Sequence, residues 1–213
     1  YIFILTNDKR IERGELLPVM EEFYSLQGEG FNTGRAAYFV RIGGCDVGCY
    51  FCDVKEAWDA SVLAPTPIEE IIERASSFPA KSVIITGGEP LLYNLTPLCK
   101  GLKENGIETI LETSGSSKMS GEWDWVCISA KRNLPPIEEN LKCTNELKMI
   151  ICDKADFAFA EEYALKVDIN HCLLYLQPEW SVSDKMMHLI VEYIKLNPKW
   201  RISLQSHKYM QIP

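Results

Sequence analysis

Short runs rich in branched aliphatic and aromatic residues alternate along this chain with helical patterns, and this alternation constrains the fold more than any other feature. The runs expected to form strands span residues 36–44, 82–90, 108–115, 125–131, 145–152, 172–178 and 201–207. Consecutive strands joined through a helix pair in parallel, because the crossover returns the chain to the same end of the sheet. The sequence therefore predicts an α/β fold, either an open sheet or an incomplete (β/α) barrel of about six parallel strands.

Capping residues mark the helices that lie between these strands. Thr66 is expected to be an N-cap, with Pro67 at the first helical position and Glu69 completing a capping box. Further helices are expected over residues 96–105, 155–166 and 183–196, where Pro198 blocks continuation.

Length and composition favour one domain over residues 1–213. Of the 213 residues, 46% are hydrophobic, which suffices to build a single core. The sequence shows no linker and no internal repeat. Residues 1–17 are expected to form an N-terminal extension that can add a strand.

The charge balance argues against two classes of partner. A formal net charge of -8 and a pI near 5.0 disfavour nucleic acid and anionic membrane surfaces, which attract clusters of Lys and Arg. The N-terminal sequence YIFILTNDKR is apolar over only its first five residues, too few for a signal peptide or a membrane span. We therefore expect a cytoplasmic protein, in which a small anionic substrate would need basic residues brought together locally.

Residues that can bind or react follow the predicted strands at the points where the strands end. They are Cys45, the glycines at 87 and 88, residues 112–114, residues 129–131, Gln177 and residues 205–207. Parallel α/β folds assemble their sites at the carboxyl ends of their strands. We therefore expect these segments to meet at one mouth of the fold.

Cys45, Cys49 and Cys52 place three thiols on one short loop, and glycines at 43, 44 and 48 permit tight turns there. Thiolates bind zinc and iron. Zinc would need a fourth ligand from elsewhere in the chain, whereas a four-iron cluster can keep one iron open for chemistry. The other cysteines are expected to be buried apolar thiols: Cys99, Cys127, Cys143, Cys152 and Cys172.

With an aromatic residue at Phe51, the loop reads C-x3-C-x-aromatic-C, which resembles the signature of the radical S-adenosylmethionine (SAM) superfamily. The sequence GGEP at 87–90 follows the second predicted strand, where that superfamily carries a similar motif. The resemblance implies a [4Fe-4S] cluster on Cys45, Cys49 and Cys52, with SAM chelating the open iron. It also implies a fold of the radical SAM type, in which Phe51 lies against the adenine.

Further segments resemble the 7-carboxy-7-deazaguanine synthase family in the same order, over residues 18–213. They are EEFYSLQGEGFNTGRAAYFVRIGGC, CDVKEAW, TGGEP, LETSG, ISAK, ELK, YLQP and RISLQSHKYMQIP. The resemblance implies ring contraction of 6-carboxy-5,6,7,8-tetrahydropterin to 7-carboxy-7-deazaguanine with loss of ammonia, in queuosine and 7-deazapurine biosynthesis. A 5′-deoxyadenosyl radical would take hydrogen from C6 of the substrate and the hydrogen would be returned afterwards, so that SAM serves as a cofactor and is not consumed. An external electron donor such as flavodoxin and a homodimer are also implied.

The resemblance assigns roles to individual residues. Contacts with the substrate are implied for Leu26, Gln27, Gly28, Glu29, Arg41, Thr86, His207 and Pro213, and contacts with SAM for Phe51, Gly88, Glu89, Ser129, Lys131 and Gln177. Arg41 is implied to bind the substrate carboxylate, as suits a guanidinium, and a structural ion pair is its alternative role. The carboxylate of the terminal Pro213 is implied to reach the pterin, with a frayed tail as the alternative.

Two positions depart from the family pattern. A Ser-Pro-Lys segment of the family corresponds here to residues 129–131, with Ala130 in the middle. The family usually has Cys-Asp-Thr after the cluster, where the threonine helps to hold Mg2+, and here Val54 has no ligand oxygen. Mg2+ is then held by other oxygens, such as those of Asp53 or water, or the enzyme needs it less.

Two other functions are compatible with the cysteine loop alone. One is an activase that takes hydrogen from a glycine of a partner protein, since such enzymes are also short and share C-x3-C-x2-C. It would leave the LQGEG and SLQSHKY segments unexplained. The other is an electron-transfer or structural metal protein, which would not cleave SAM.

Overall fold

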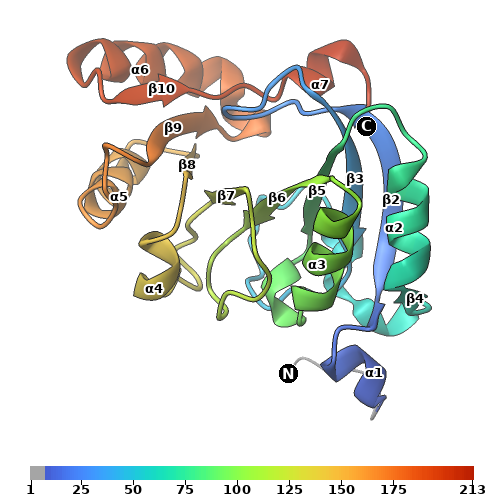
Figure 1. Ribbon diagram of the computed structural model, residues 1–213. Coiled ribbons are helices and arrows are strands. Elements are labelled where there is room, and N and C mark those ends of the chain that lie inside the picture. Colours follow the sequence, from blue (N-terminus) through green and yellow to red (C-terminus); the bar gives the residue numbers. More distant parts are fainter. Residues whose placement is uncertain (1–7) are drawn as a thin grey trace.

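A curved eight-stranded sheet runs through the protein, for which a computed structural model describes residues 8–213 (Figure 1). Its strands are β2 (Val19–Leu26), β3 (Ala36–Ile42), β5 (Ser82–Gly87), β6 (Glu108–Thr113), β7 (Trp125–Ile128), β8 (Glu146–Ile151), β9 (Leu173–Pro178) and β10 (Trp200–Ile202). Their spatial order is β10-β9-β8-β7-β6-β5-β3-β2. Only β2 pairs antiparallel, with β3. The predicted α/β class is confirmed: six of the predicted runs each contain a parallel strand, and the last run, 201–207, overlaps β10, which begins one residue earlier.

The sheet curves without closing, so the barrel is incomplete, as predicted. Strands β2 and β10 stand at its two ends and do not pair with each other in the described part of the chain. The segment between β2 and β3 approaches the far end: the Gly30 N–H donates to Ser203 Oγ (2.9 Å), and the Ser206 N–H donates to the Gly28 carbonyl (2.9 Å). Figure 1 shows this segment in blue, running beside α7 (Ser206–Met210). Loop contacts thus link the two ends of the sheet.

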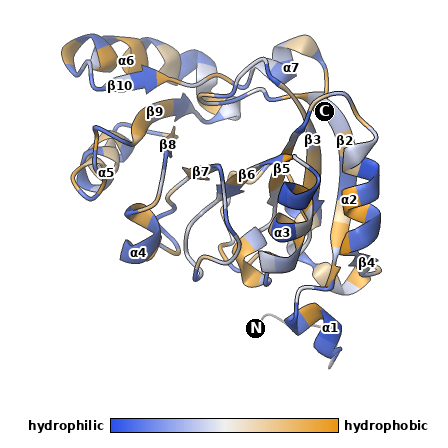
Figure 2. Cartoon of the chain, viewed as in Figure 1, coloured by the Kyte–Doolittle hydropathy of each residue, from blue (hydrophilic) through white to orange (hydrophobic). Residues whose placement is uncertain are grey.

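Helices cover the outer face of the sheet. The longer ones are α2 (Ile68–Ser76), α3 (Thr96–Glu104), α5 (Ala155–Ala164) and α6 (Ser183–Leu196); the shorter ones are α1 (Lys9–Glu12) and α4 (Glu138–Leu141), with 3-10 turns at Lys55–Trp58, Ala60–Val62, Pro90–Leu92 and Trp180–Val182. Helix α2 buries Ile68, Ile71 and Ala75, which share one face at helical spacing. Figure 2 shows hydrophobic and hydrophilic residues interleaved along these helices, as expected when one face packs on a core.

Three of the predicted helices, α3, α5 and α6, are confirmed, and α2 differs at its start. The capping box at Thr66 is wrong, because Thr66 and Pro67 form the two-residue strand β4, antiparallel to β1 (Leu16–Leu17). Helix α2 therefore begins one residue later, at Ile68, without a side-chain cap. Pairing with β1 holds Thr66 in an extended backbone, and this outweighs its preference for capping.

The N-terminal part of the chain contains a helix, α1, and a strand, β2, that were not predicted from the sequence. Of the predicted extension 1–17, residues 1–7 lie outside the described part of the chain, and the rest holds α1 and β1. Strand β2 was missed because Glu21 and Glu22 interrupt its apolar residues and nearly all of its side chains are only half-buried. As an edge strand, β2 tolerates such charges.

A small apolar cluster lies on the inner side of the sheet, apart from the main core under the helices. It contains Ala37, Phe39, Ile84 and Ile110, with Phe23 and Trp125 packed against them. Side chains of a strand alternate between its two faces, so residues two places further along face the same interior. Arg41, Thr86 and Glu112 occupy such places and line a cavity beyond the cluster. The cluster is therefore the floor of that cavity.

The five cysteines outside the loop differ in burial. Cys99, Cys127 and Cys172 are buried, as expected. The prediction is wrong for Cys143, which is exposed, and for Cys152, which is half-buried. Both follow the end of an element, α4 and β8 respectively, where the chain leaves the core.

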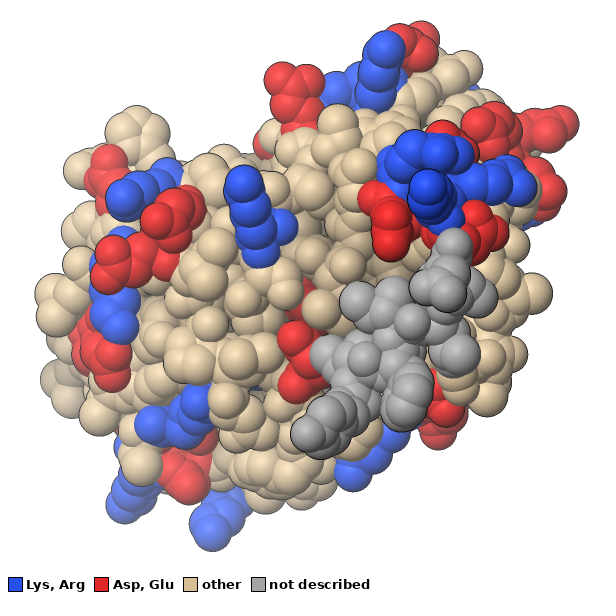
Figure 3. Space-filling view, turned by 90° about the horizontal axis from the view of Figure 1, so that it is seen from below, with Lys and Arg blue, Asp and Glu red and all other residues tan. Residues whose placement is uncertain are grey.

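The outer surface carries charges of both signs. On the face in Figure 3, Lys and Arg lie interspersed with Asp and Glu. Within residues 8–213, no helix combines the length and the apolar character needed to cross a bilayer.

Candidate functional site

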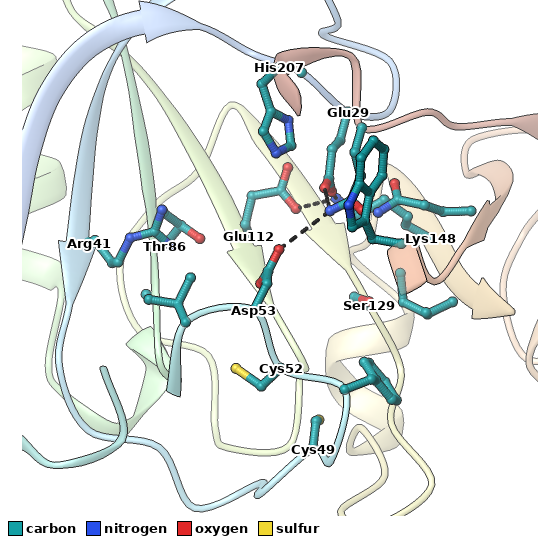
Figure 4. Close-up of a pocket in the computed structure, with 18 of the residues that line it drawn as sticks. Glu29, Arg41, Cys49, Cys52, Asp53, Thr86, Glu112, Ser129, Lys148 and His207 are labelled. Atoms are coloured by element: carbon teal, nitrogen blue, oxygen red, sulfur yellow. Dashed lines mark hydrogen bonds and ion pairs between the residues drawn. The ribbon is translucent and has the colours of Figure 1, made fainter. Parts of the chain in front are cut away.

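A cavity of about 490 Å3 opens where the parallel strands end (Figure 4). Its wall contains these predicted site residues: Leu26, Gln27, Gly28, Glu29, Arg41, Cys45, Cys49, Phe51, Cys52, Asp53, Thr86, Gly88, Ser129, Lys131, Gln177, His207 and Pro213. Glu89 is the one predicted site residue that does not line the cavity. The segments that follow separate strands thus meet at one mouth, as the sequence predicted.

Tight turns shape the cysteine loop. Gly44 and Gly48 have positive φ angles of 96° and 64°, which residues with a Cβ rarely adopt. The Gly44 N–H donates to the Ala57 carbonyl (2.7 Å), and the Cys52 N–H donates to the Cys49 carbonyl (3.1 Å). These bonds fold the loop so that all three thiols line the cavity.

The thiols fit the protein ligands of a four-iron cluster, in which each thiolate binds one iron. Burial raises the pKa of Cys45 and of Cys49, and the Lys131 ammonium counteracts this at Cys49. Over residues 8–213, no three His, Cys, Asp or Glu side chains are grouped so as to hold a single metal ion. Three thiols from one loop leave the fourth iron of a cluster free for another ligand.

Gly88 packs directly on the cysteine loop. The Gly88 N–H donates to the Ile42 carbonyl (2.8 Å), and the Glu89 N–H donates to the Gly44 carbonyl (2.8 Å). A Cβ at position 88 would lie 2.2 Å from the Gly44 oxygen and 2.9 Å from Cys45 Cβ. The absence of a side chain at Gly88 is therefore what allows the end of β5 to support the thiols.

Glu89 lies behind the cavity wall and is fully buried. Its carboxylate accepts hydrogen bonds from the N–H groups of Leu91 (3.0 Å) and Ser114 (2.8 Å) and from the hydroxyls of Thr113 and Ser114. The side chain thus joins the end of β5 to the end of β6. Its predicted contact with SAM stays a prediction, and the described contacts show a structural role.

Four other predicted SAM contacts lie around the cysteine loop. Lys131 is close to Phe51, with Nζ 5.8 Å from the ring centroid, and donates to the hydroxyl of Ser129. Burial lowers the pKa of Lys131, and nearby Cys49 opposes that change. Gln177 is buried and accepts a hydrogen bond from Ser203 (2.6 Å). With Ala130 in place of proline, the chain still brings Ser129 and Lys131 to the cavity.

A buried polar network forms another part of the wall. Lys148 Nζ lies 2.6 Å from Glu29 Oε2 and 3.0 Å from Glu112 Oε2. Gln205 donates to Glu29 (2.9 Å), and Gln27 donates to Glu112 (3.1 Å). Burial would raise the pKa of Glu29, but Lys148 and Gln205 outweigh it and lower that pKa to about 2. Glu29 is therefore a carboxylate at neutral pH.

Arg41 is placed where it can bind a ligand, and it also forms an ion pair within the protein. It lines the cavity, and its Nε donates to Glu21 on the neighbouring strand β2 (2.5 Å). Its terminal nitrogens make no other hydrogen bond within the described part of the chain. Figure 4 shows Arg41 beside Thr86, across the cavity from Glu29 and Lys148. Glu21 thus orients the guanidinium while its outer edge stays available.

The carboxyl-terminal segment closes the cavity on the side of β2. A Cβ at Gly28 would lie 2.1 Å from His207 Nδ1, so this glycine makes room for the imidazole. Burial lowers the pKa of His207. The Ser25 hydroxyl donates to the backbone oxygen of Pro213 (3.3 Å), which places the chain end at the cavity.

Glu112, Lys148 and Gln205 are wall residues to which the sequence gave no role. Glu112 and residues 205–207 were expected at strand ends, but their hydrogen-bond partners are distant in the sequence. Glu112 is 36 positions from Lys148, and Gln205 is 176 positions from Glu29. One signal was present: Glu146 and Lys148 are charged residues within the apolar strand ELKMII. Charges in a buried strand are rare unless they are paired or functional.

Comparison with known proteins gives consistent matches. The family model "Radical SAM superfamily" matches residues 39–168. A 7-carboxy-7-deazaguanine synthase from Flavobacterium psychrophilum is 52% identical, over 95% of this chain and 96% of that protein. The crystal structure of QueE from Escherichia coli superposes with a TM-score of 0.79 at 31% identity, over 95% of this chain and 99% of that one.

A more distant structure shares the fold alone. It is Streptococcus suis SuiB bound to S-adenosylmethionine, at 15% identity and a TM-score of 0.50. The match covers 74% of this chain and 44% of that one.

The packing of Gly88 on the cysteine loop predicts a specific defect. A Gly88→Ala variant should lose most of its capacity to hold iron and sulfide, because the new methyl group would displace Gly44 and Cys45. Iron and sulfide per chain after anaerobic reconstitution measure this. Gly34→Ala is the matched control, since a Cβ there meets nothing within 4 Å; its strain at a φ of 84° costs about 1 kcal/mol. A cluster content equal to that of the control would contradict the packing argument.

Proposed function

Because the chain belongs to the radical SAM superfamily and, within it, to the 7-carboxy-7-deazaguanine synthases, we propose that it contracts the ring of 6-carboxy-5,6,7,8-tetrahydropterin to 7-carboxy-7-deazaguanine with loss of ammonia. This is a carbon–nitrogen lyase reaction. The observation that supports it most is that the three-thiol loop and the network of Glu29, Lys148 and Glu112 line one cavity. Nothing in the cavity or among the relatives favours an activase of a partner protein.

We propose that Cys45, Cys49 and Cys52 hold a [4Fe-4S] cluster. When bound, the cluster supplies the electron that cleaves SAM to a 5′-deoxyadenosyl radical. Phe51, next to Cys52, is proposed to lie against the adenine. Lys131, whose only described hydrogen bond goes to the neutral Ser129, can attract the methionine carboxylate of SAM.

The substrate is proposed to lie on the opposite wall from the SAM contacts. Glu29 and Glu112 can accept from N–H groups of the pterin, since both are carboxylates that line the cavity. Arg41 is proposed to bind the substrate carboxylate, and Thr86 beside it offers a hydroxyl. The remaining substrate contacts are proposed for the end of β2 with the residues after it and for the carboxyl-terminal segment: Leu26, Gln27, Gly28, His207 and Pro213.

We propose that Mg2+ binds beside the substrate and that the protein holds it only weakly. Asp53 gives one carboxylate to the cavity wall, and Val54 gives no oxygen. Nitrogen groups surround Asp53 Oδ2, with Lys208 Nζ at 3.3 Å and Gln205 Nε2 at 3.5 Å. Mg2+ requires oxygen ligands and often keeps several waters. Asp53, water and the substrate carboxylate are therefore the ligands we propose.

The setting of the enzyme is also proposed rather than observed. We propose one functional domain, a homodimeric assembly, a cytoplasmic location and an external electron donor such as flavodoxin. The biosynthetic role of the family supports the cytoplasmic location. The half-exposed thiol loop at the cavity mouth is compatible with electron delivery from outside.

Product analysis tests the proposed reaction. Protein reconstituted with iron and sulfide, then reduced in the presence of SAM and the pterin, should form 7-carboxy-7-deazaguanine over many turnovers. Cys49→Ala should lose the cluster and all turnover, because one iron of the cluster already lacks a protein thiolate. Cys143→Ala, at an exposed position outside the cavity, is the control and should retain activity. Absence of both 5′-deoxyadenosine and the deazaguanine would refute radical chemistry, and 5′-deoxyadenosine without the deazaguanine would refute the substrate.

Loss of the Arg41 guanidinium should weaken substrate binding selectively. An Arg41→Ala variant should bind the pterin about thirtyfold more weakly, since a hydrogen-bonded charge contributes about 2 kcal/mol. Cluster content and SAM cleavage without substrate should stay unchanged. The control is Arg35→Ala, which removes an exposed ion pair with Glu108 (2.6 Å) away from the cavity. Equal substrate affinity in the two variants would exclude Arg41 from the substrate site.

Position 54 should control the dependence on Mg2+. Removing Mg2+ from the parent protein is expected to lower kcat/KM by less than about tenfold, because Val54 offers no ligand. Val54→Thr should bind Mg2+ more tightly and lose more activity without it. Val62→Thr, at an exposed position outside the cavity, is the control. A parent protein that is inactive without Mg2+, with no change in Val54→Thr, would show that other oxygens hold the ion.

A further inference from the structure

Lys148 is the most deeply buried cation of the cavity wall. Its side chain is 5% exposed and points inward from the middle of β8, between Glu29 on the segment after β2 and Glu112 on β6 (Figure 4). These two carboxylates are separated by more than 80 positions in the sequence and share this one ammonium. The position of each carboxylate therefore depends on the other through Lys148.

The hydrogen bonds of the network leave room for a ligand. In each carboxylate, one oxygen accepts from Lys148 and the other accepts from a side-chain amide. The amide is that of Gln205 for Glu29 and that of Gln27 for Glu112. A carboxylate has about four lone-pair sites, so about two on each side chain remain for other donors. Both carboxylates line the cavity, which makes those sites accessible to a ligand there.

Glu146 provides an internal comparison, because it is a buried carboxyl on the same strand without an ion pair. Its Oε2 accepts from the Phe31 N–H (3.1 Å) and from Trp125 Nε1 (3.2 Å), and its Oε1 has no partner among the described residues. Burial and the nearby charge of Glu112 raise the pKa of Glu146 to about 7. The pKa of Glu29, in contact with Lys148, is about 2. The charge of Lys148 lowers the pKa of Glu146 as well, but Glu146 has no ion pair with it, whereas Glu29 contacts Lys148 directly and also accepts from Gln205.

Several charged or titratable groups surround this network. From the packed elements they are Glu29, Glu112, Cys127, Lys131, Glu146 and His207. Burial opposes the charge on Lys148, but the adjacent carboxylates outweigh it and raise its pKa. No other cation contacts Glu29 or Glu112 within residues 8–213. No group in the described region can therefore replace the ammonium of Lys148.

We propose that Lys148 is a positioning residue of the reaction: through its bonds to Glu29 and Glu112 it holds both carboxylates turned into the cavity, where together they accept N–H donors of the substrate ring. This inference rests on the proposed function and adds a residue that does not itself touch the substrate. Its consequence is a substrate affinity that stays constant as the pH falls through neutrality. Without Lys148, Glu29 would lose the ammonium that lowers its pKa, and burial would raise that pKa.

A purely structural role for Lys148 makes a different prediction. It would lower stability and reduce all functions together, with no change in the pH profile of substrate binding. Arg74→Met is the matched control for that outcome, because Arg74 forms a partly buried ion pair with Glu22 (2.6 Å) outside the cavity. This control should lose stability and keep the substrate affinity of the parent protein at each pH.

The test compares cluster-loaded parent, Lys148→Met and Lys148→Arg proteins, each with SAM bound. Dissociation constants for the carboxytetrahydropterin are measured at pH about 6 and about 8, on either side of the pKa of Glu146. We expect Lys148→Met to bind at least about tenfold more weakly at the higher pH, with a further loss at the lower pH. The parent affinity should be flat. Lys148→Arg should keep the flat profile.

A second variant covers the case in which Lys148→Met does not fold. Lys148→Met combined with Glu29→Gln removes one of the two carboxylates left without a cation, and with Glu112 as the remaining acceptor binding should be weak at both pH values. Parent-like affinity at both pH values, in either Lys148→Met variant, would overturn the proposal. A parent protein that cleaves SAM but neither binds nor converts the pterin would instead refute the proposed function, and this inference with it.

Discussion

The alternation of side chains along the inward-curving strands is the constraint on which the rest of the structure depends. On β3 and β6 it turns Phe39 and Ile110 into the apolar floor, and two positions later it turns Arg41 and Glu112 into the cavity wall. A polar residue can thus stand next to a packed core without disrupting it. Because all these strands but β2 run in parallel, their polar ends face one mouth.

Much of the fold followed from local sequence patterns. Helix α6 occupies the predicted residues, and every predicted run overlaps a strand, because hydrophobic periodicity and strand ends are local properties. The failures came from tertiary contacts that override local preference. Thr66 pairs with Leu17 instead of capping α2, and β2 is stabilised as an edge strand despite Glu21 and Glu22.

The site could be predicted where its chemistry is contiguous in the sequence and not where it is assembled from distant segments. The cysteine loop, with Gly44 and Gly48 at its turns, was recognisable because spacing and turn residues lie together. The partners of Lys148 could not be identified, because Glu29 and Glu112 meet it only after the sheet has formed. Glu89 has a structural role that its motif did not indicate: its carboxylate joins the end of β5 to the end of β6.

The charges of the cavity explain how an acidic protein can hold anionic ligands. The chain has a net charge of -8, yet its cavity wall includes Arg41, Lys131 and Lys148. Their surroundings differ: Lys148 is neutralised by two carboxylates, whereas Lys131 contacts a neutral hydroxyl and Arg41 shares only its Nε with Glu21. Electrostatic attraction for a carboxylate is therefore strongest at two places on separate walls. A SAM carboxylate and a pterin carboxylate can then be held apart, one beside the thiols and the other beside β3.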